Sequence, residues 1–166
     1  MSQIFVGVSM PHKFKLGAES IKWWIGAPYS HAYIRFESSE IPSTVYHAAH
    51  GMVHFKAYDN FLIDNAVFEE FKIEMDNDKR IEILTECINI AGEPYDKTDL
   101  IYILASDIAN KLGKKASNYD GPGYICSELV GKILIEKLGF IFAKPTHLLS
   151  PKDIFDAMEK YESSHS

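Results

Sequence analysis

Apolar and polar side chains alternate along the first half of the chain, which predicts β-strands. The alternation is clearest in Ser30–Glu37, where apolar positions alternate with polar or hydroxylated ones: Ala32, Ile34 and Phe36 with His31, Tyr33 and Arg35. Runs of β-branched and aromatic residues predict further strands at Gln3–Met10, in Thr44–Tyr58 and at Ala66–Met75. We expect Thr44–Tyr58 to form two strands joined by a tight hairpin turn at His50-Gly51. Helical spacing predicts a helix over Gly17–Ala27 and a short helical turn over Asp59–Asn65.

The second half of the chain instead has the spacing of helices. Apolar residues recur at helical intervals, with glycine or proline at the ends, in four segments: Asp76–Asp96, Thr98–Gly113, Tyr124–Gly139 and Ser150–Tyr161. Strands followed by helices are typical of an α+β fold, so we expect an antiparallel sheet from the first half packed against helices of the second half. The pattern predicts one domain over residues 1–162 and a disordered tail over residues 163–166.

Composition narrows the class of protein. The chain has 166 residues, 46% hydrophobic and 24% charged, which suits a single globular domain. The net charge of −6 argues against a nucleic-acid-binding protein, which would usually carry a basic patch. The composition does not indicate the oligomeric state.

We expect neither a signal peptide nor a membrane-spanning segment in this sequence. The first residues form a predicted strand instead of a signal peptide, and no window approaches eighteen uncharged apolar residues, so we expect no transmembrane segment. The default location is cytoplasmic, and a phage or virion protein would have the same features. Two cysteines exclude a disulfide scaffold.

Cys126 is the strongest candidate for chemistry. It follows the loop residues Gly121, Pro122 and Gly123 and stands at the predicted start of a helix. The positive end of the helix dipole favours a thiolate there and lowers a thiol pKa. Cysteine is also among the most buried residue types, so a packing role is the alternative. Cys87 lies in the middle of a predicted helix, where packing is the better interpretation.

Two histidines could serve as base and orienting group. His31 and His47 lie on adjacent predicted strands, where side chains can approach to roughly 5 Å at Cβ. A metal site formed by His47, His50 and His54 is disfavoured, because their spacing suits a helix and they should scatter on a hairpin broken at Gly51. Neither a phosphate-binding glycine loop nor a metal motif is present, so we expect no cofactor and no metal.

The adjacent tryptophans Trp23 and Trp24 cannot share one face of a helix. One should enter the core, and the other could line a substrate groove. Ordinary packing is the alternative for both.

Four motifs in sequence order resemble one family of hydrolases. They are "WWIGAPYSHAYIRF", "VYHAAHG", "GEPYDKTDLIY" and "YICSELV", followed by "LLSPKDIFD" near the end. This series resembles the circularly permuted papain-like cysteine amidases, the permuted branch of the NlpC-type hydrolases that includes the YiiX-like proteins. Lecithin-retinol acyltransferase is a more distant relative with the same order. The resemblance spans Ile4 to Met158 and implies a permuted papain-like fold, in which the histidine strand precedes the cysteine helix.

The resemblance implies roles for individual residues. Cys126 corresponds to the nucleophile and His31 to the general base. The third position is His47, where many YiiX-like members have a glutamate. Tyr95 and Tyr124 are competing candidates near the oxyanion. Ser30 and Trp24 are further candidates for substrate contact.

These features lead to one main hypothesis and two alternatives. The main hypothesis is a cysteine peptidase or amidase that cleaves a peptide or peptidoglycan-like amide bond through an acyl-enzyme. A thioesterase or acyltransferase on lipid-like substrates would use the same three residues. A non-catalytic structural or binding protein could retain the fold without the activity.

Overall fold

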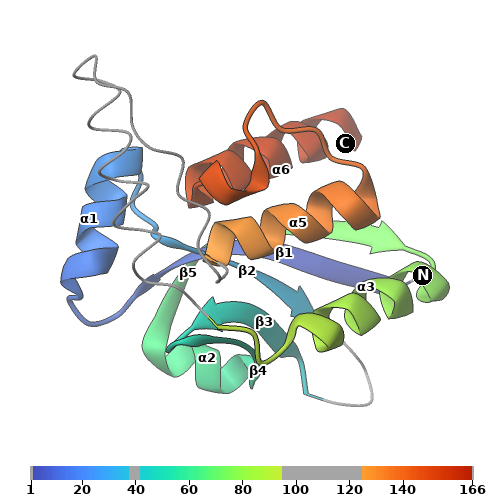
Figure 1. Cartoon of the computed structure of the whole chain (residues 1–166), viewed down its shortest axis with the longest axis horizontal. Coiled ribbons are helices and arrows are strands. Elements are labelled where there is room, and N and C mark those ends of the chain that lie inside the picture. Colours follow the sequence, from blue (N-terminus) through green and yellow to red (C-terminus); the bar gives the residue numbers. More distant parts are fainter. Residues whose placement is uncertain (1, 38–41, 95–124, 166) are drawn as a thin grey trace.

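The described residues form an α+β fold built on one five-stranded antiparallel sheet (Figure 1). The structure, a computed structural model, describes residues 2–37, 42–94 and 125–165. The strands lie in the order β4-β3-β2-β1-β5. Their bounds are β1 Ser2–Pro11, β2 His31–Phe36, β3 Thr44–Ala49, β4 Met52–Ala57 and β5 Asn65–Met75. The whole described sheet therefore comes from the first half of the chain, as the sequence predicts.

The hairpin between β3 and β4 turns at the two residues that the sequence indicates. His50 has φ 55° and Gly51 has φ 92°, so both central residues are left-handed, as a two-residue type I′ turn requires. The strands then pair symmetrically about the turn, with Ala49 opposite Met52 and, two positions further, His47 opposite His54.

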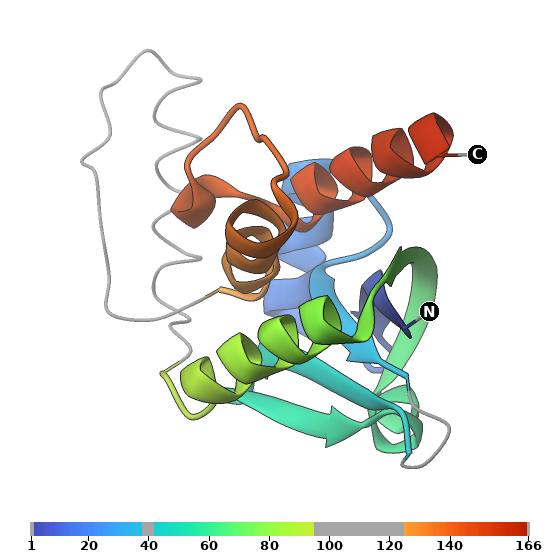
Figure 2. The ribbon, with the colours of Figure 1, turned by 90° about the vertical axis from the view of Figure 1, so that its right-hand side faces the viewer.

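Among the described residues, three helices cover one face of the sheet and a short helix lies on the other (Figures 1 and 2). The covering helices are α3 Asn77–Ile90, α5 Cys126–Leu138 and α6 Pro151–His165. Helix α2, Tyr58–Asp64, lies on the opposite face, and α1, Leu16–Ile25, joins β1 to β2. A short 3₁₀ turn, Thr146–Leu148, precedes α6. The main core lies between the three helices and the sheet, with Ile4, Ile34, Leu129 and Ile154 among its fully buried members.

Two elements extend past the residue at which the sequence predicts that they end. Strand β1 includes Pro11, and α6 continues to His165 through most of the segment predicted to be a disordered tail. The extra helical turn is supported by the ring of His165, which stacks on Tyr161 one turn earlier with 4.1 Å between ring centroids. The predicted helix Thr98–Gly113 lies outside the described residues.

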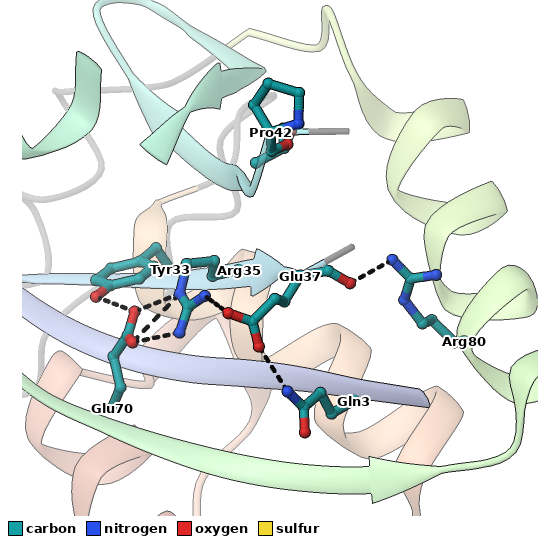
Figure 3. A network of polar contacts seen from close by, with 8 residues as sticks. Gln3, Tyr33, Arg35, Glu37, Pro42, Glu70 and Arg80 are labelled. Carbon is teal, nitrogen blue, oxygen red and sulfur yellow. Dashed lines mark hydrogen bonds and ion pairs between the residues drawn. The ribbon is translucent and has the colours of Figure 1, made fainter. Parts of the chain in front are cut away.

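A buried ion pair lies on the face of β2 that is turned away from the main core (Figure 3). The guanidinium of Arg35 donates to both carboxylate oxygens of Glu70 on β5, with a shortest distance of 2.7 Å, and also to Glu37 at 3.2 Å. Its planar group lies over the rings of Phe5 and Tyr58, 3.8 and 4.6 Å from their centroids. The charge is thus removed from water only together with its partners, which is the condition for burying an arginine.

Tyr33 explains why β1 has a glycine in its middle. The tyrosine ring crosses over β1 and donates its hydroxyl hydrogen to Glu70 at 2.8 Å. A Cβ on Gly7, which is the cross-strand partner of Tyr33, would lie 2.4 Å from the Cζ atom of that ring. Only glycine leaves space for this crossing. Tyr33 and Phe61 of α2 then form a second small cluster beneath the sheet, with ring centroids 4.7 Å apart.

Candidate functional site

Cys126 is the first residue of α5, as the sequence predicts. Ile125 before it is extended, with φ −87° and ψ 159°, and its N–H points to the carboxylate of Glu128 at 3.4 Å. The thiol therefore lies at the positive end of the helix dipole. The residue is buried within the main core, with 7% of its surface exposed.

The first turns of α5 are held tightly against the loop before α6. Ser127 donates its hydroxyl hydrogen to the carbonyl of Leu149 at 2.5 Å. One turn later a Cβ on Gly131 would lie 2.3 Å from the Cδ1 atom of Leu149. The hydrogen bond and the close approach of the glycine fix the helix start, and with it the position of Cys126 over the sheet.

Strands β2 and β3 separate at the level of this helix start. Their pairing runs from Phe36 to Ile34 and ends at the pair Ile34–Tyr46, whereas β1 remains paired with β2 as far as His31. The first residues of β2 therefore have β1 on one side but are outside the described ladder with β3 on the other. The backbone amide of Ala32, next to His31, interacts with the thiol of Cys126.

A chain of three histidines crosses this opening. The Nε2 atom of His31 lies 2.9 Å from Nδ1 of His47, and Nε2 of His47 lies 3.1 Å from Nε2 of His54. The Nδ1 atom of His54 in turn lies 3.3 Å from the carbonyl oxygen of Met52. The structure thus brings together the two histidines that the sequence pairs, and it adds a third.

His54 corrects one sequence-based expectation. The histidines at 47, 50 and 54 were expected to scatter on the hairpin, but His47 and His54 face each other as cross-strand partners. His50 stands in the turn and makes no side-chain hydrogen bond to the described residues. The missed signal was the turn itself: residues equally distant from His50-Gly51 must face each other in a two-residue hairpin.

Burial keeps the first two histidines neutral. It lowers the pKa of His31 to about 4, and nearby Lys15 and the other imidazoles act in the same direction. Burial also lowers the pKa of His47 to about 2, with further contributions from His31 and His54. Desolvation disfavours the imidazolium form because the charge loses water. Both rings are therefore neutral near pH 7, and each has one protonated and one unprotonated nitrogen.

The resting state of Cys126 differs from the expectation of a lowered pKa. Burial raises the pKa of the thiol above its ordinary value, and the backbone amides of Ala32, Ser127 and Cys126 oppose that effect without reversing it. A neutral thiol therefore faces the helix dipole. Cys87 in α3 is fully buried, and burial raises its pKa as well, in agreement with a packing role.

Of the four remaining candidates for substrate or oxyanion contact, the structure describes Ser30 and Trp24. Ser30 is buried, and its backbone N–H donates to the carbonyl of Ser9 at 3.0 Å, which ties the start of β2 to β1. Trp24 is half-buried on α1, and Trp23 is the exposed member of the pair, with 80% of its surface open. Tyr95 and Tyr124 lie outside the described residues.

The described residues contain neither a metal-binding cluster nor a membrane-spanning helix. Residues 2–37, 42–94 and 125–165 contain no group of three or more His, Cys, Asp or Glu side chains arranged to hold a metal ion. Among the helices of these same ranges, none has the length and apolarity needed to span a bilayer. Comparison with protein-family models and with curated proteins gives no match.

Proposed function

We propose that the protein is a cysteine hydrolase with a permuted papain-like fold that cleaves an amide bond. The observation that carries the proposal is the 2.9 Å contact between His31 and His47 at the opening of β2 and β3, next to Ala32, whose backbone amide interacts with the thiol of Cys126. A cysteine at a helix start, a histidine at a strand start and a polar group orienting that histidine form the general arrangement of a nucleophilic triad.

In this proposal Cys126 is the nucleophile and His31 is the general base. As Sγ of Cys126 attacks the substrate carbonyl carbon, its proton moves to the unprotonated Nδ1 atom of His31. The imidazolium then gives this proton to the leaving amine as the C–N bond breaks. Water hydrolyses the acyl-enzyme with the same base and restores the neutral thiol. His47 holds the ring of His31 through Nε2 during both steps.

The pKa directions favour proton transfer during attack over a preformed ion pair. A raised thiol pKa and a lowered imidazole pKa both stabilise the neutral pair at rest. The backbone N–H of Cys126 is free of an intrahelical partner because it belongs to the first turn of α5. It is suited to hold the oxyanion, and loss of one such donor typically costs about 2.7–4 kcal/mol in transition-state stabilisation.

The substrate proposed is a peptide or a peptidoglycan-like fragment. Its class follows from the family resemblance of the motifs around His31 and Cys126, and small peptide amides and soluble cell-wall peptides are therefore the first compounds to assay. Short acyl thioesters belong in the same panel, since the same residues would cleave them. A clear preference for thioesters would replace the amidase with a thioesterase.

The test compares three single variants with the wild-type protein. We expect Cys126→Ala and His31→Ala each to abolish turnover while circular dichroism shows an unchanged fold. Cys87→Ala is the matched control, because Cys87 lies mid-helix in α3 and should leave turnover intact. Wild-type turnover in the Cys126 variant would contradict the proposal.

A further inference from the structure

The last contact in the histidine chain involves a group that cannot donate a hydrogen bond. The Nδ1 atom of His54 lies 3.3 Å from the carbonyl oxygen of Met52, and a carbonyl oxygen only accepts. Nδ1 of His54 must therefore carry the ring proton for this contact to be attractive. In a neutral imidazole the other nitrogen, Nε2, is then an acceptor.

The position of the proton on His54 determines which nitrogen is protonated in each of the other two rings. Because Nε2 of His54 accepts, Nε2 of His47 must donate across their 3.1 Å contact, and Nδ1 of His47 is left as an acceptor. Nε2 of His31 then donates to that acceptor at 2.9 Å. The proton of His31 is thus on Nε2, and its Nδ1 atom, which makes no hydrogen bond to the described residues, carries the free lone pair.

The reverse order of ring protons would be unfavourable at both ends of the histidine chain. It would place the lone pair of His54 Nδ1 against the lone pairs of the Met52 carbonyl. It would also put a proton on Nδ1 of His31, so that this atom could not accept the proton of Cys126. The carbonyl is held in place, because Val53, between Met52 and His54, exchanges two backbone hydrogen bonds with Gly92 and Glu93 at 2.8 and 2.9 Å.

The charged groups around the histidine chain favour neutral rings at His31 and His47. Besides the three rings themselves, the described cationic or titratable groups that act on His31 and His47 are Lys15, His50 and Lys56, and all of them oppose protonation of these rings. Lys56 is paired with Asp64 at 2.7 Å, an exposed contact that faces away from the main core. No described carboxylate hydrogen-bonds to any of the three imidazoles. The carbonyl of Met52 is thus the group that determines the proton order.

We propose that His54 is a positioning residue that sets the tautomer of His31, so that the base of the proposed hydrolase presents an unprotonated Nδ1 atom. His54 acts through His47 and contacts no substrate. This inference rests on the proposed function for its catalytic meaning, but the proton order can be measured without turnover.

The first experiment is a long-range ¹H–¹⁵N correlation spectrum of the imidazole rings in the full-length protein near neutral pH. We expect the Nε2–H tautomer for His31 and His47 and the rarer Nδ1–H tautomer for His54. The wild-type spectrum is sufficient for this test, so it does not depend on how any variant folds. An Nδ1–H tautomer at His31 would overturn the inference.

The second experiment uses His54→Leu, His54→Gln and, as matched control, His50→Asn. Leucine removes the acceptor for His47, whereas glutamine can replace it with its amide oxygen, and asparagine tolerates the left-handed backbone of position 50. We expect His54→Leu to lower kcat/KM roughly tenfold with KM unchanged and to lose the single tautomer of His31. His54→Gln should recover both, and His50→Asn should leave both unchanged.

The outcomes separate the inference from the hydrolase proposal. If His54→Leu keeps the wild-type kcat and the His31 tautomer, the positioning role is wrong. If the wild-type protein shows the expected tautomers but cleaves neither amides nor thioesters, the hydrolase proposal fails, and the catalytic meaning of His54 fails with it. The proton order itself would then stand as a structural property.

Discussion

The Nε2 atom of His31 lies 2.9 Å from Nδ1 of His47 at the end of the sheet where β2 and β3 no longer pair. In register, His31 would face Ala49, so the two histidines meet diagonally across the opening. A side-chain contact thus replaces the backbone ladder at this level. It joins the two strands next to Ala32, whose backbone amide interacts with the thiol of Cys126.

The pH dependence of Cys126 alkylation tests the resting state of the site. Because burial raises the thiol pKa, we expect the rate to increase with pH and to reach half its maximum above the ordinary thiol value of about 8.5. Mass spectrometry of the alkylated peptides measures both cysteines in one experiment. Cys87 should react more slowly at every pH, because it is fully buried in the middle of α3.

His31→Ala is the informative variant for this measurement. If His31 accepts the thiol proton during attack, its loss should slow alkylation of Cys126 near neutral pH and leave Cys87 unchanged. Half-maximal reaction of Cys126 well below pH 7 would instead mean a preformed thiolate–imidazolium pair and would contradict the neutral resting state.

Acid should destabilise the protein through His47. The folded-state pKa of about 2 lies below the ordinary value of 6.5, so below pH 6.5 the unfolded chain binds a proton that the folded chain does not. The stabilising contribution is therefore present above pH 6.5 and is lost as the pH falls. A fully buried histidine contributes a slope of up to about 1.4 kcal/mol per pH unit to the free energy of unfolding.

Urea unfolding between pH 7 and pH 5 in wild type and His47→Gln measures this contribution. We expect a shallower pH dependence in the variant, which has lost the titrating ring. His165→Gln, at the exposed end of α6, is the control and should retain the wild-type slope. Equal slopes in wild type and His47→Gln would show that His47 is not held neutral by the fold.

Gly7→Ala should destabilise the fold without touching the site. The added methyl group would lie 2.4 Å from the Cζ atom of Tyr33, and that ring is held by its hydrogen bond to Glu70. Overpacking of this kind costs about 1–3 kcal/mol in the free energy of unfolding, which urea denaturation measures. Gly17→Ala is the matched control, because nothing lies within 4 Å of a Cβ there and alanine favours a helix. Equal effects of the two substitutions would contradict the crowding at Gly7.

The ion pair of Arg35 and Glu70 should be far more important for stability than exposed pairs. The side chain of Arg35 is only 8% exposed, so Arg35→Met removes the partner of a largely buried carboxylate. Breaking such a pair from one side costs about 3–5 kcal/mol in the free energy of unfolding. Lys72→Met is the control: it breaks the exposed pair with Glu74 and should change stability little. A similar small change in both variants would show that the Arg35 pair is well solvated.

Local sequence signals account for most of the elements and for the position of the nucleophile candidate. The glycines and prolines at element ends, the alternation in β2 and the His50-Gly51 turn act over a few residues, so they are readable in the chain itself. For the same reason the sequence correctly places Cys126 at a helix start. It also pairs His31 with His47, because strands that follow each other in sequence usually lie side by side.

Long-range packing accounts for the features that the sequence leaves open. The separation of β2 from β3, the burial of Arg35 against Glu70 and the close approach of Gly131 to Leu149 depend on residues far apart in the chain. The raised pKa of Cys126 also arises from burial, which outweighs the local helix dipole. Local propensity thus determines which residues stand at element ends, whereas desolvation and the proton order of the histidine chain exist only once the sheet and helices have packed together.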